Sequence, residues 1–98
     1  MQIEIKNITA NPVTLLRRAG YIFQRNEGSE MSFVRVLARS ASYPRFHMYV
    51  SVVGTDMKIN IHLDQKKETY GTGTRHHGEY EDEGALKIEV ERLMGLLR

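Results

Sequence analysis

The chain has 98 residues, of which 41% are hydrophobic and 27% charged, with a formal net charge of +2 and no cysteine. This length and composition suit a single soluble domain, 1–98, that buries a core of its own. The lack of cysteine excludes disulfides, thiolate zinc sites and a cysteine nucleophile, and it fits the cytoplasmic location that we expect. No apolar run approaches the roughly 18 residues of a membrane-spanning helix, so we expect no membrane partner.

The first part of the chain has the signals of a strand followed by a helix. Residues 2–6 alternate apolar and polar side chains, as a β-strand does. Asn11-Pro12 predicts the start of a helix, because Asn caps helix N-termini and Pro suits the first helical position. Gly20 fits the left-handed position at a helix C-terminus, so we expect this helix to end just before it.

Residues 21–26 and 31–39 have the pattern of two strands joined by a turn at Gly28-Ser29. This turn predicts two pairs on the buried face, which are Phe23 with Val34 and Tyr21 with Val36. The opposite face then carries Gln24, Phe33, Arg35 and Arg39. We therefore expect an aromatic ring and two arginines to point away from the core.

The segments 45–53 and 56–64 form the most regular pattern in the chain, and Gly54-Thr55 between them fits a hairpin turn. With this turn, one face has only apolar pairs: Val52 with Met57, Val50 with Ile59, Met48 with Ile61 and Phe46 with Leu63. The other face has only polar pairs: Ser51 with Lys58, Tyr49 with Asn60, His47 with His62 and Arg45 with Asp64. A shift by one residue would mix the two sets, so the pattern specifies the register.

The last part of the chain combines a long loop with a helix. Residues 65–80 lack apolar periodicity and predict a loop, of the kind that is usually functional or mobile. The acidic run 81–83 suits a helix N-terminus, and the leucines that follow lie at helical spacing. The resulting order is β-α-β-β-β-β-α. Two amphipathic helices and a sheet with one apolar face predict an α+β fold, in which both helices cover one face of a two-layer antiparallel sheet.

The open face of this sheet is the first candidate site. Arginine side chains bind phosphates and aromatic rings stack on unpaired bases, so the two together indicate RNA or single-stranded DNA. A net charge of +2 is too small to indicate nucleic-acid binding by itself, but most basic residues lie before residue 76. The predicted nucleic-acid-binding residues are Phe33, Arg35, Arg39, Arg45, Tyr49, Lys66 and Arg75.

The facing histidines His47 and His62 are the second candidate site. Two imidazoles, one neutral and one protonated, can act as general base and general acid in RNA transesterification. A neighbouring Arg45, Lys58 or Lys66 could stabilise the charged phosphorane, and a ribonuclease of this kind needs no metal. Two exposed histidines that merely oppose each other are the simpler interpretation.

A divalent metal ion is the third candidate. His62 and Asp64 lie on one strand face, and the loop after this strand carries His76, His77 and Glu79. Histidine and carboxylate ligands together suit zinc, iron or manganese. The loop is long enough to fold back onto the sheet, so these five residues form a candidate ligand set.

Other common active-site motifs do not occur in the chain. Gly71–Thr74 is not followed by the Gly-Lys-Ser/Thr of a phosphate-binding loop, and no GxSxG motif is present. Ser51 lies four residues along the strand from His47, roughly 13 Å away. We therefore do not expect serine catalysis at Ser51.

A family resemblance covers residues 15–30. The run Leu15-Leu16-Arg17-Arg18-Ala19-Gly20-Tyr21, followed by Arg25 and Gly28-Ser29, resembles the start of HicA-type mRNA interferases. The resemblance implies a fold like that of double-stranded-RNA-binding domains and RNA as a partner. In that family a catalytic histidine follows Gly-Ser, and here Glu30 stands in its place, so the resemblance implies no catalytic residue. RNA cleavage would then depend on His47 or His62.

The sequence thus predicts, first, a small nucleic-acid-binding domain that uses the open sheet face and the loop 65–80. The alternative is a small hydrolase or ribonuclease at His47 and His62, with or without a divalent metal. A third interpretation is a protein-interaction module, in which the open face or the acidic final helix contacts another chain.

Overall fold

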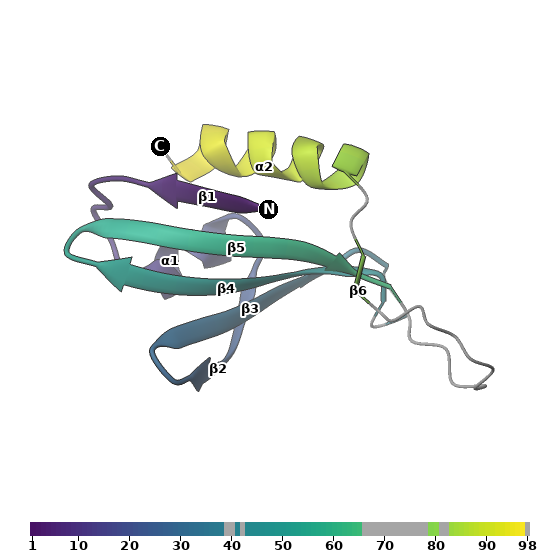
Figure 1. The fold of residues 1–98 in the computed structure, drawn as a ribbon, viewed down its shortest axis with the longest axis horizontal. Helices are drawn as coiled ribbons and strands as arrows, with labels where there is room; N and C mark the ends of the chain where they lie inside the picture. The colour runs from purple at the N-terminus through teal and green to yellow at the C-terminus, as the bar shows by residue number, and fades with distance from the viewer. Residues whose placement is uncertain (39–40, 42, 66–78, 81–82, 98) are drawn as a thin grey trace.

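A computed structural model describes residues 1–38, 41, 43–65, 79–80 and 83–97. Its elements in chain order are β1 (Gln2–Ile5), α1 (Pro12–Arg18), β2 (Ile22–Glu27), β3 (Glu30–Val36), β4 (Arg45–Val53), β5 (Asp56–Asp64), β6 (Glu79–Tyr80) and α2 (Glu83–Leu97). The strands pair antiparallel in the order β1-β5-β4-β3-β2, and β6 pairs with the end of β5 (Figure 1). The predicted α+β fold is confirmed, and β6 is an addition to the predicted order.

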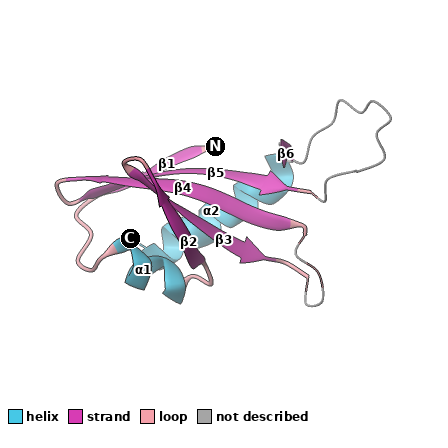
Figure 2. Ribbon diagram, turned by 90° about the horizontal axis from the view of Figure 1, so that it is seen from below, coloured by secondary structure: helices cyan, strands magenta, loops and turns pink. Residues whose placement is uncertain are grey.

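Both helices pack on the same face of the sheet (Figure 2). Leu16 of α1 and Leu93 of α2 are fully buried, and they share one core cluster with strand residues such as Met48. The start of α1 is as predicted, because the Asn11 side chain accepts a hydrogen bond from the backbone N–H of Thr14 at 2.9 Å. The helices therefore cover one side of the sheet and leave the side chains of the other side available for a site.

No helix in the described ranges is long and apolar enough to cross a membrane.

The β4–β5 hairpin has the register that the alternating pattern predicts. Val53 pairs with Asp56 across the Gly54-Thr55 turn, and the pairs continue in step to Arg45 and Asp64. Gly54 has a φ of +66°, a left-handed conformation that a residue without Cβ adopts at little cost. The apolar face is buried in the core through Phe46, Met48, Val50, Met57, Ile59, Ile61 and Leu63. The polar set of the hairpin consequently lies on the face away from the helices.

The β2–β3 pair differs from the prediction by one residue. The Gly28-Ser29 turn is present, but the register shifts at a bulge between Phe23 and Arg25. Phe23 consequently pairs with Phe33 instead of Val34. A bulge adds one residue to one strand, and a shift by one residue changes which partner side chains share a face.

This shift corrects the location of two predicted site residues. Phe33 is fully buried in the core, and its ring lies 5.6 Å from that of Phe23. Arg35 also lies on the helix-covered side, where its guanidinium contacts the carboxylate of Glu89 on α2 at 3.4 Å. The prediction that Phe33 and Arg35 lie on the open face is therefore wrong.

The composition of β3 explains why its pattern was ambiguous. Met31 and Phe33 alternate on one face, and Val34 and Val36 alternate on the other, so both faces are apolar in the sequence. Pairing with β4 decides between them, because Val34 lies opposite His47 on the polar side of the sheet.

Candidate metal centre

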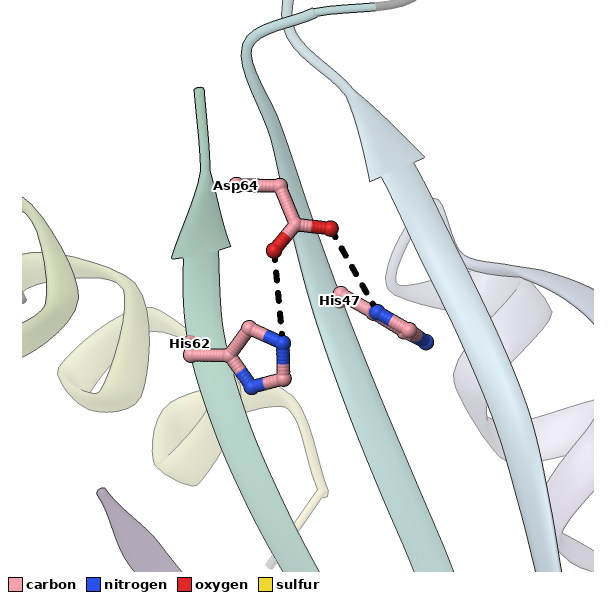
Figure 3. A group of neighbouring side chains, drawn as sticks. All are labelled: His47, His62 and Asp64. Atoms are coloured by element: carbon pink, nitrogen blue, oxygen red, sulfur yellow. Dashed lines mark ion pairs between the residues drawn. The ribbon is translucent and has the colours of Figure 1, made fainter. Parts of the chain in front are cut away.

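The polar face of the hairpin brings His47, His62 and Asp64 together, and we name these three residues the His-His-Asp cluster (Figure 3). His47 on β4 pairs with His62 on β5, and their ring centroids are 5.0 Å apart. Asp64 follows His62 by two residues and therefore projects from the same face of β5. The predicted catalytic pair and two of the predicted metal ligands thus form one cluster.

Each carboxylate oxygen of Asp64 faces one imidazole. Oδ2 lies 3.4 Å from Nδ1 of His47, and Oδ1 lies 3.3 Å from Nε2 of His62. One potential ligand atom from each of the three residues lies within 4.8 Å of the other two. A tetrahedral zinc ion with bonds of about 2.0–2.1 Å holds its ligand atoms about 3.3–3.4 Å apart. Small side-chain rotations would therefore arrange the three atoms around one ion.

The cluster is mostly but not completely shielded from water. The exposed fractions of the side chains are 9% for His47, 16% for His62 and 13% for Asp64. Burial lowers the pKa of His47, and the charges of His62 and Arg45 lower it further. The charge of Asp64 and the hydrogen bond that it accepts from the protonated ring oppose this change. The neutral imidazole that results is the form that binds metal ions.

The other nitrogen of His47 contacts Ser32, which in turn contacts Gln24. Ser32 on β3 is fully buried, and its Oγ lies 2.8 Å from Nε2 of His47. The same hydroxyl donates a hydrogen bond to Oε1 of Gln24 on β2 at 3.1 Å. A hydrogen-bonded chain therefore runs from β2 across β3 to the His-His-Asp cluster. The sequence does not single out Ser32, because the pairing that brings it to His47 joins two strands whose register the sequence pattern does not specify.

Arg45 and Tyr49 lie beside the cluster on the open face. The Nε of Arg45 lies 3.4 Å from Oδ2 of Asp64, and its guanidinium carbon lies 4.6 Å from the ring centroid of Tyr43. The ring centroid of Tyr49 lies 4.7 Å from that of His47. Tyr49 also lines a groove of about 440 Å³ on the open face. The rest of the groove is lined by residues of β1, β3 and the turn-proximal half of the hairpin, so Tyr49 separates it from the two histidines.

The remaining predicted site residues are not placed by the structure. The following lie outside the described residues: Arg39, Lys66, Arg75, His76 and His77. The backbone of Glu79 in β6 pairs with Asp64, which brings this strand alongside the cluster, but the side chain of Glu79 is not described. Nucleic-acid binding by the open face and metal binding by the loop residues therefore stay predictions.

Comparison of the chain with protein-family models, with curated proteins and with solved structures found no match. The resemblance of residues 15–30 to HicA-type interferases stays a prediction. The functional argument accordingly depends on the geometry of the site.

Proposed function

We propose that this protein is a metal-binding domain that holds one divalent transition-metal ion, such as zinc, between His47, His62 and Asp64. The main support is the spacing of 3.3–3.4 Å between two imidazole nitrogens and the two oxygens of one carboxylate. Direct hydrogen bonds from charged N–H groups to carboxylates are shorter, at about 2.7–2.9 Å. The spacing therefore suits an ion between the groups better than it suits a shared proton.

The ligand number and the partial exposure of the cluster support a catalytic use of the metal. Among the described residues three protein ligands come together, which leaves a coordination position for water or substrate, as in catalytic zinc sites, whereas structural zinc sites have four protein ligands. The three side chains are 9–16% exposed, so the open face gives some access to the site. We therefore propose hydrolysis of an ester or phosphoester, a reaction that zinc supports by lowering the pKa of bound water. RNA as the substrate and a cytoplasmic location stay predictions.

Zinc titration of the full-length, metal-stripped protein tests the binding. We expect the wild type to bind about one equivalent, and Asp64→Asn to lose more than about 100-fold in affinity, which exceeds the usual effect of an outer-shell partner. Asp56→Asn is the matched control, because Asp56 lies at the other end of β5 and pairs with Lys6 at 3.7 Å. A wild-type protein that binds no zinc, manganese or iron would refute the proposal.

A double variant, His76→Gln with His77→Gln, separates the His-His-Asp cluster from the larger ligand set that the sequence predicted. If the cluster is sufficient, this variant binds zinc with the wild-type stoichiometry. For the activity, the zinc-loaded wild type and Asp64→Asn should be compared on a model phosphodiester and on an RNA oligonucleotide. Hydrolysis that is equal in the two proteins would contradict a catalytic role of the site.

A further inference from the structure

We infer that Ser32 and Gln24 are positioning residues that keep the ring proton of His47 on Nε2 and thereby present Nδ1 to the metal ion. This inference rests on the proposed metal function and deepens it, because it assigns the ligand atom of one histidine and the residues that control it.

The direction of the hydrogen bonds carries the argument. A serine hydroxyl has a single proton, and Ser32 donates it to Oε1 of Gln24 at 3.1 Å. Toward His47, the oxygen of Ser32 can therefore only accept. Its neighbour at 2.8 Å is Nε2 of His47, which must then carry the ring proton. Because a neutral imidazole has one N–H, Nδ1 keeps its lone pair.

The lone pair of Nδ1 is directed toward a position beside Asp64 where a cation could bind. Nδ1 of His47 lies 3.4 Å from Oδ2 of Asp64, and in the inferred neutral tautomer these two atoms are acceptors that face each other. A metal ion in this position would replace their repulsion by two bonds. Histidines that bind metals commonly donate their other ring N–H to a fixed partner, which sets both the tautomer and the ring orientation. Buried Ser32 is suited to this task, because its surroundings hold it in one position.

The opposite proton arrangement is the competing interpretation. If the hydroxyl of Ser32 donated to Nε2, Nδ1 would donate to Asp64, in the order of a Ser-His-Asp triad. The exposed fraction of Ser32 is 0%, so a substrate could not reach its Oγ. This arrangement would therefore have no accessible nucleophile, and it would place a proton on the nitrogen that faces Asp64.

Two substitutions of the exposed Gln24 should control whether the hydroxyl of Ser32 donates toward position 24 or toward His47, without changing the core. Gln24→Glu offers only acceptor oxygens, so Ser32 should continue to donate toward position 24. Gln24→Lys offers only donor protons, so the hydroxyl of Ser32 should turn and donate to Nε2 of His47. Asn26→Lys adds the same charge elsewhere on β2 and serves as the charge-matched control.

Nitrogen-15 NMR of the histidine rings in the metal-free, full-length protein reports the tautomer directly. We expect His47 to carry the proton on Nε2 in the wild type, in Gln24→Glu and in Asn26→Lys, and on Nδ1 in Gln24→Lys. The zinc affinity of Gln24→Lys should be about 10–100-fold lower, as is typical when an outer-shell partner is lost. If Gln24→Lys does not fold, Ser32→Ala should abolish the preference for Nε2.

The outcomes distinguish this inference from the metal function. A wild-type His47 with its proton on Nδ1, or a tautomer that does not respond to these substitutions, would overturn the positioning role even if zinc binds normally. If the tautomer responds as expected but the wild type binds no metal, the proposed function fails while Ser32 and Gln24 still position His47.

Discussion

Each face of the sheet carries a carboxylate surrounded by polar groups, and the two differ in the length of their shortest contacts, although Arg35 lies 3.4 Å from Glu89. On the helix-covered face, Glu89 of α2 accepts hydrogen bonds from the Tyr21 hydroxyl at 2.6 Å and from Arg92 at 2.8 and 2.9 Å. On the open face, the contacts of Asp64 with His47, His62 and Arg45 are 3.3–3.4 Å long.

Two arginines supply permanent positive charges beside Glu89. Arg92 and Arg35 stay protonated at any physiological pH, and Arg92 also donates to the backbone oxygen of Ala19 at 2.7 Å, which connects α2 to the end of α1. Burial alone would raise the pKa of Glu89, but hydrogen bonds from Arg92 and Tyr21 and the charges of both arginines lower it overall. The cluster around Glu89 is a structural one, since Glu89 accepts three short hydrogen bonds from Tyr21 and Arg92 and has two arginines beside it.

The cluster around Asp64 depends more on groups whose charge can vary. Arg45 supplies one permanent cation, whereas burial favours the neutral form of His47. Long contacts to a neutral base leave space for another cation beside the carboxylate. The comparison teaches that two features distinguish a structural ion pair from a candidate ligand site. A structural carboxylate has short hydrogen bonds and permanent cations, whereas a candidate ligand has longer contacts to groups that can lose their charge.

The largest expected effect is a metal-dependent stability that only the open-face cluster supplies. Zinc at one hundred times its Kd should stabilise the folded wild type by about 2.7 kcal/mol, which raises Tm by more than about 10 °C in a domain of this size. Thermal unfolding with and without excess zinc measures the shift. Asp64→Asn should lose it and Glu89→Gln should keep it. A shift that survives in Asp64→Asn would place the metal elsewhere.

Loss of the helix-side carboxylate should reduce stability without affecting the metal. Glu89→Ala removes the partner of a buried tyrosine hydroxyl and of two arginines, but the arginine side chains are about one-third exposed and can turn toward water. We therefore expect a loss of about 2 kcal/mol in urea unfolding, less than for a fully buried ion pair. Glu91→Ala, at an exposed position of the same helix, should change stability by less than about 0.5 kcal/mol. Weaker zinc binding by Glu89→Ala would show that the two faces are coupled.

The same carboxylate should make stability depend on pH in the acid range. The pKa of Glu89 is lower in the folded protein than its ordinary value of 4.5, so the unfolded chain takes up this proton first as the pH falls. The contribution is complete above pH 4.5 and is lost as the pH falls through the folded pKa. Urea unfolding of metal-free protein between about pH 6 and 3 should show a shallower acid decline for Glu89→Gln than for the wild type. If the free energies of unfolding of the two proteins fell in parallel with pH, the assignment of this pH dependence to Glu89 would be wrong.

The smallest expected effect concerns Arg45, whose contact with Oδ2 of Asp64 would compete with the proposed metal ion. Arg45→Gln removes this cation and should tighten zinc binding by about 3- to 10-fold, as expected for a partly screened charge. Arg25→Gln, which breaks the exposed ion pair with Glu27, should leave zinc affinity unchanged. Calorimetric titration measures both. Weaker binding by Arg45→Gln would instead indicate that Arg45 holds Asp64 in position.

The hairpin shows how much of the site was predictable. Side chains alternate with a period of two, and a two-residue turn permits one register, so the facing pair His47 and His62 follows from the sequence pattern. The same alternation places Asp64 beside them. His62 and Asp64 are therefore predicted ligands, whereas the sequence predicts His47 only as a catalytic residue, and the distances add it to the ligand set.

The β2–β3 pair shows where sequence reasoning was insufficient. Both faces of β3 are apolar in the sequence, and the bulge at Gln24 has no strong local signal, so the pattern predicts the wrong face for Phe33. The pattern does not single out Ser32 for the same reason. Its contact with His47 joins two strands whose pairing depends on the whole sheet.

The sequence by itself determined the order of the main elements, the hairpin register and the placement of His47, His62 and Asp64 on one face, because these follow from local alternation and turn geometry. Only the tertiary structure decided which face of β3 joins the core, which donors and cations compensate the negative charge of Glu89, and which nitrogen of His47 contacts Ser32. These features depend on contacts between distant segments and on differences of a few tenths of an ångström, which a pattern of residue types does not contain.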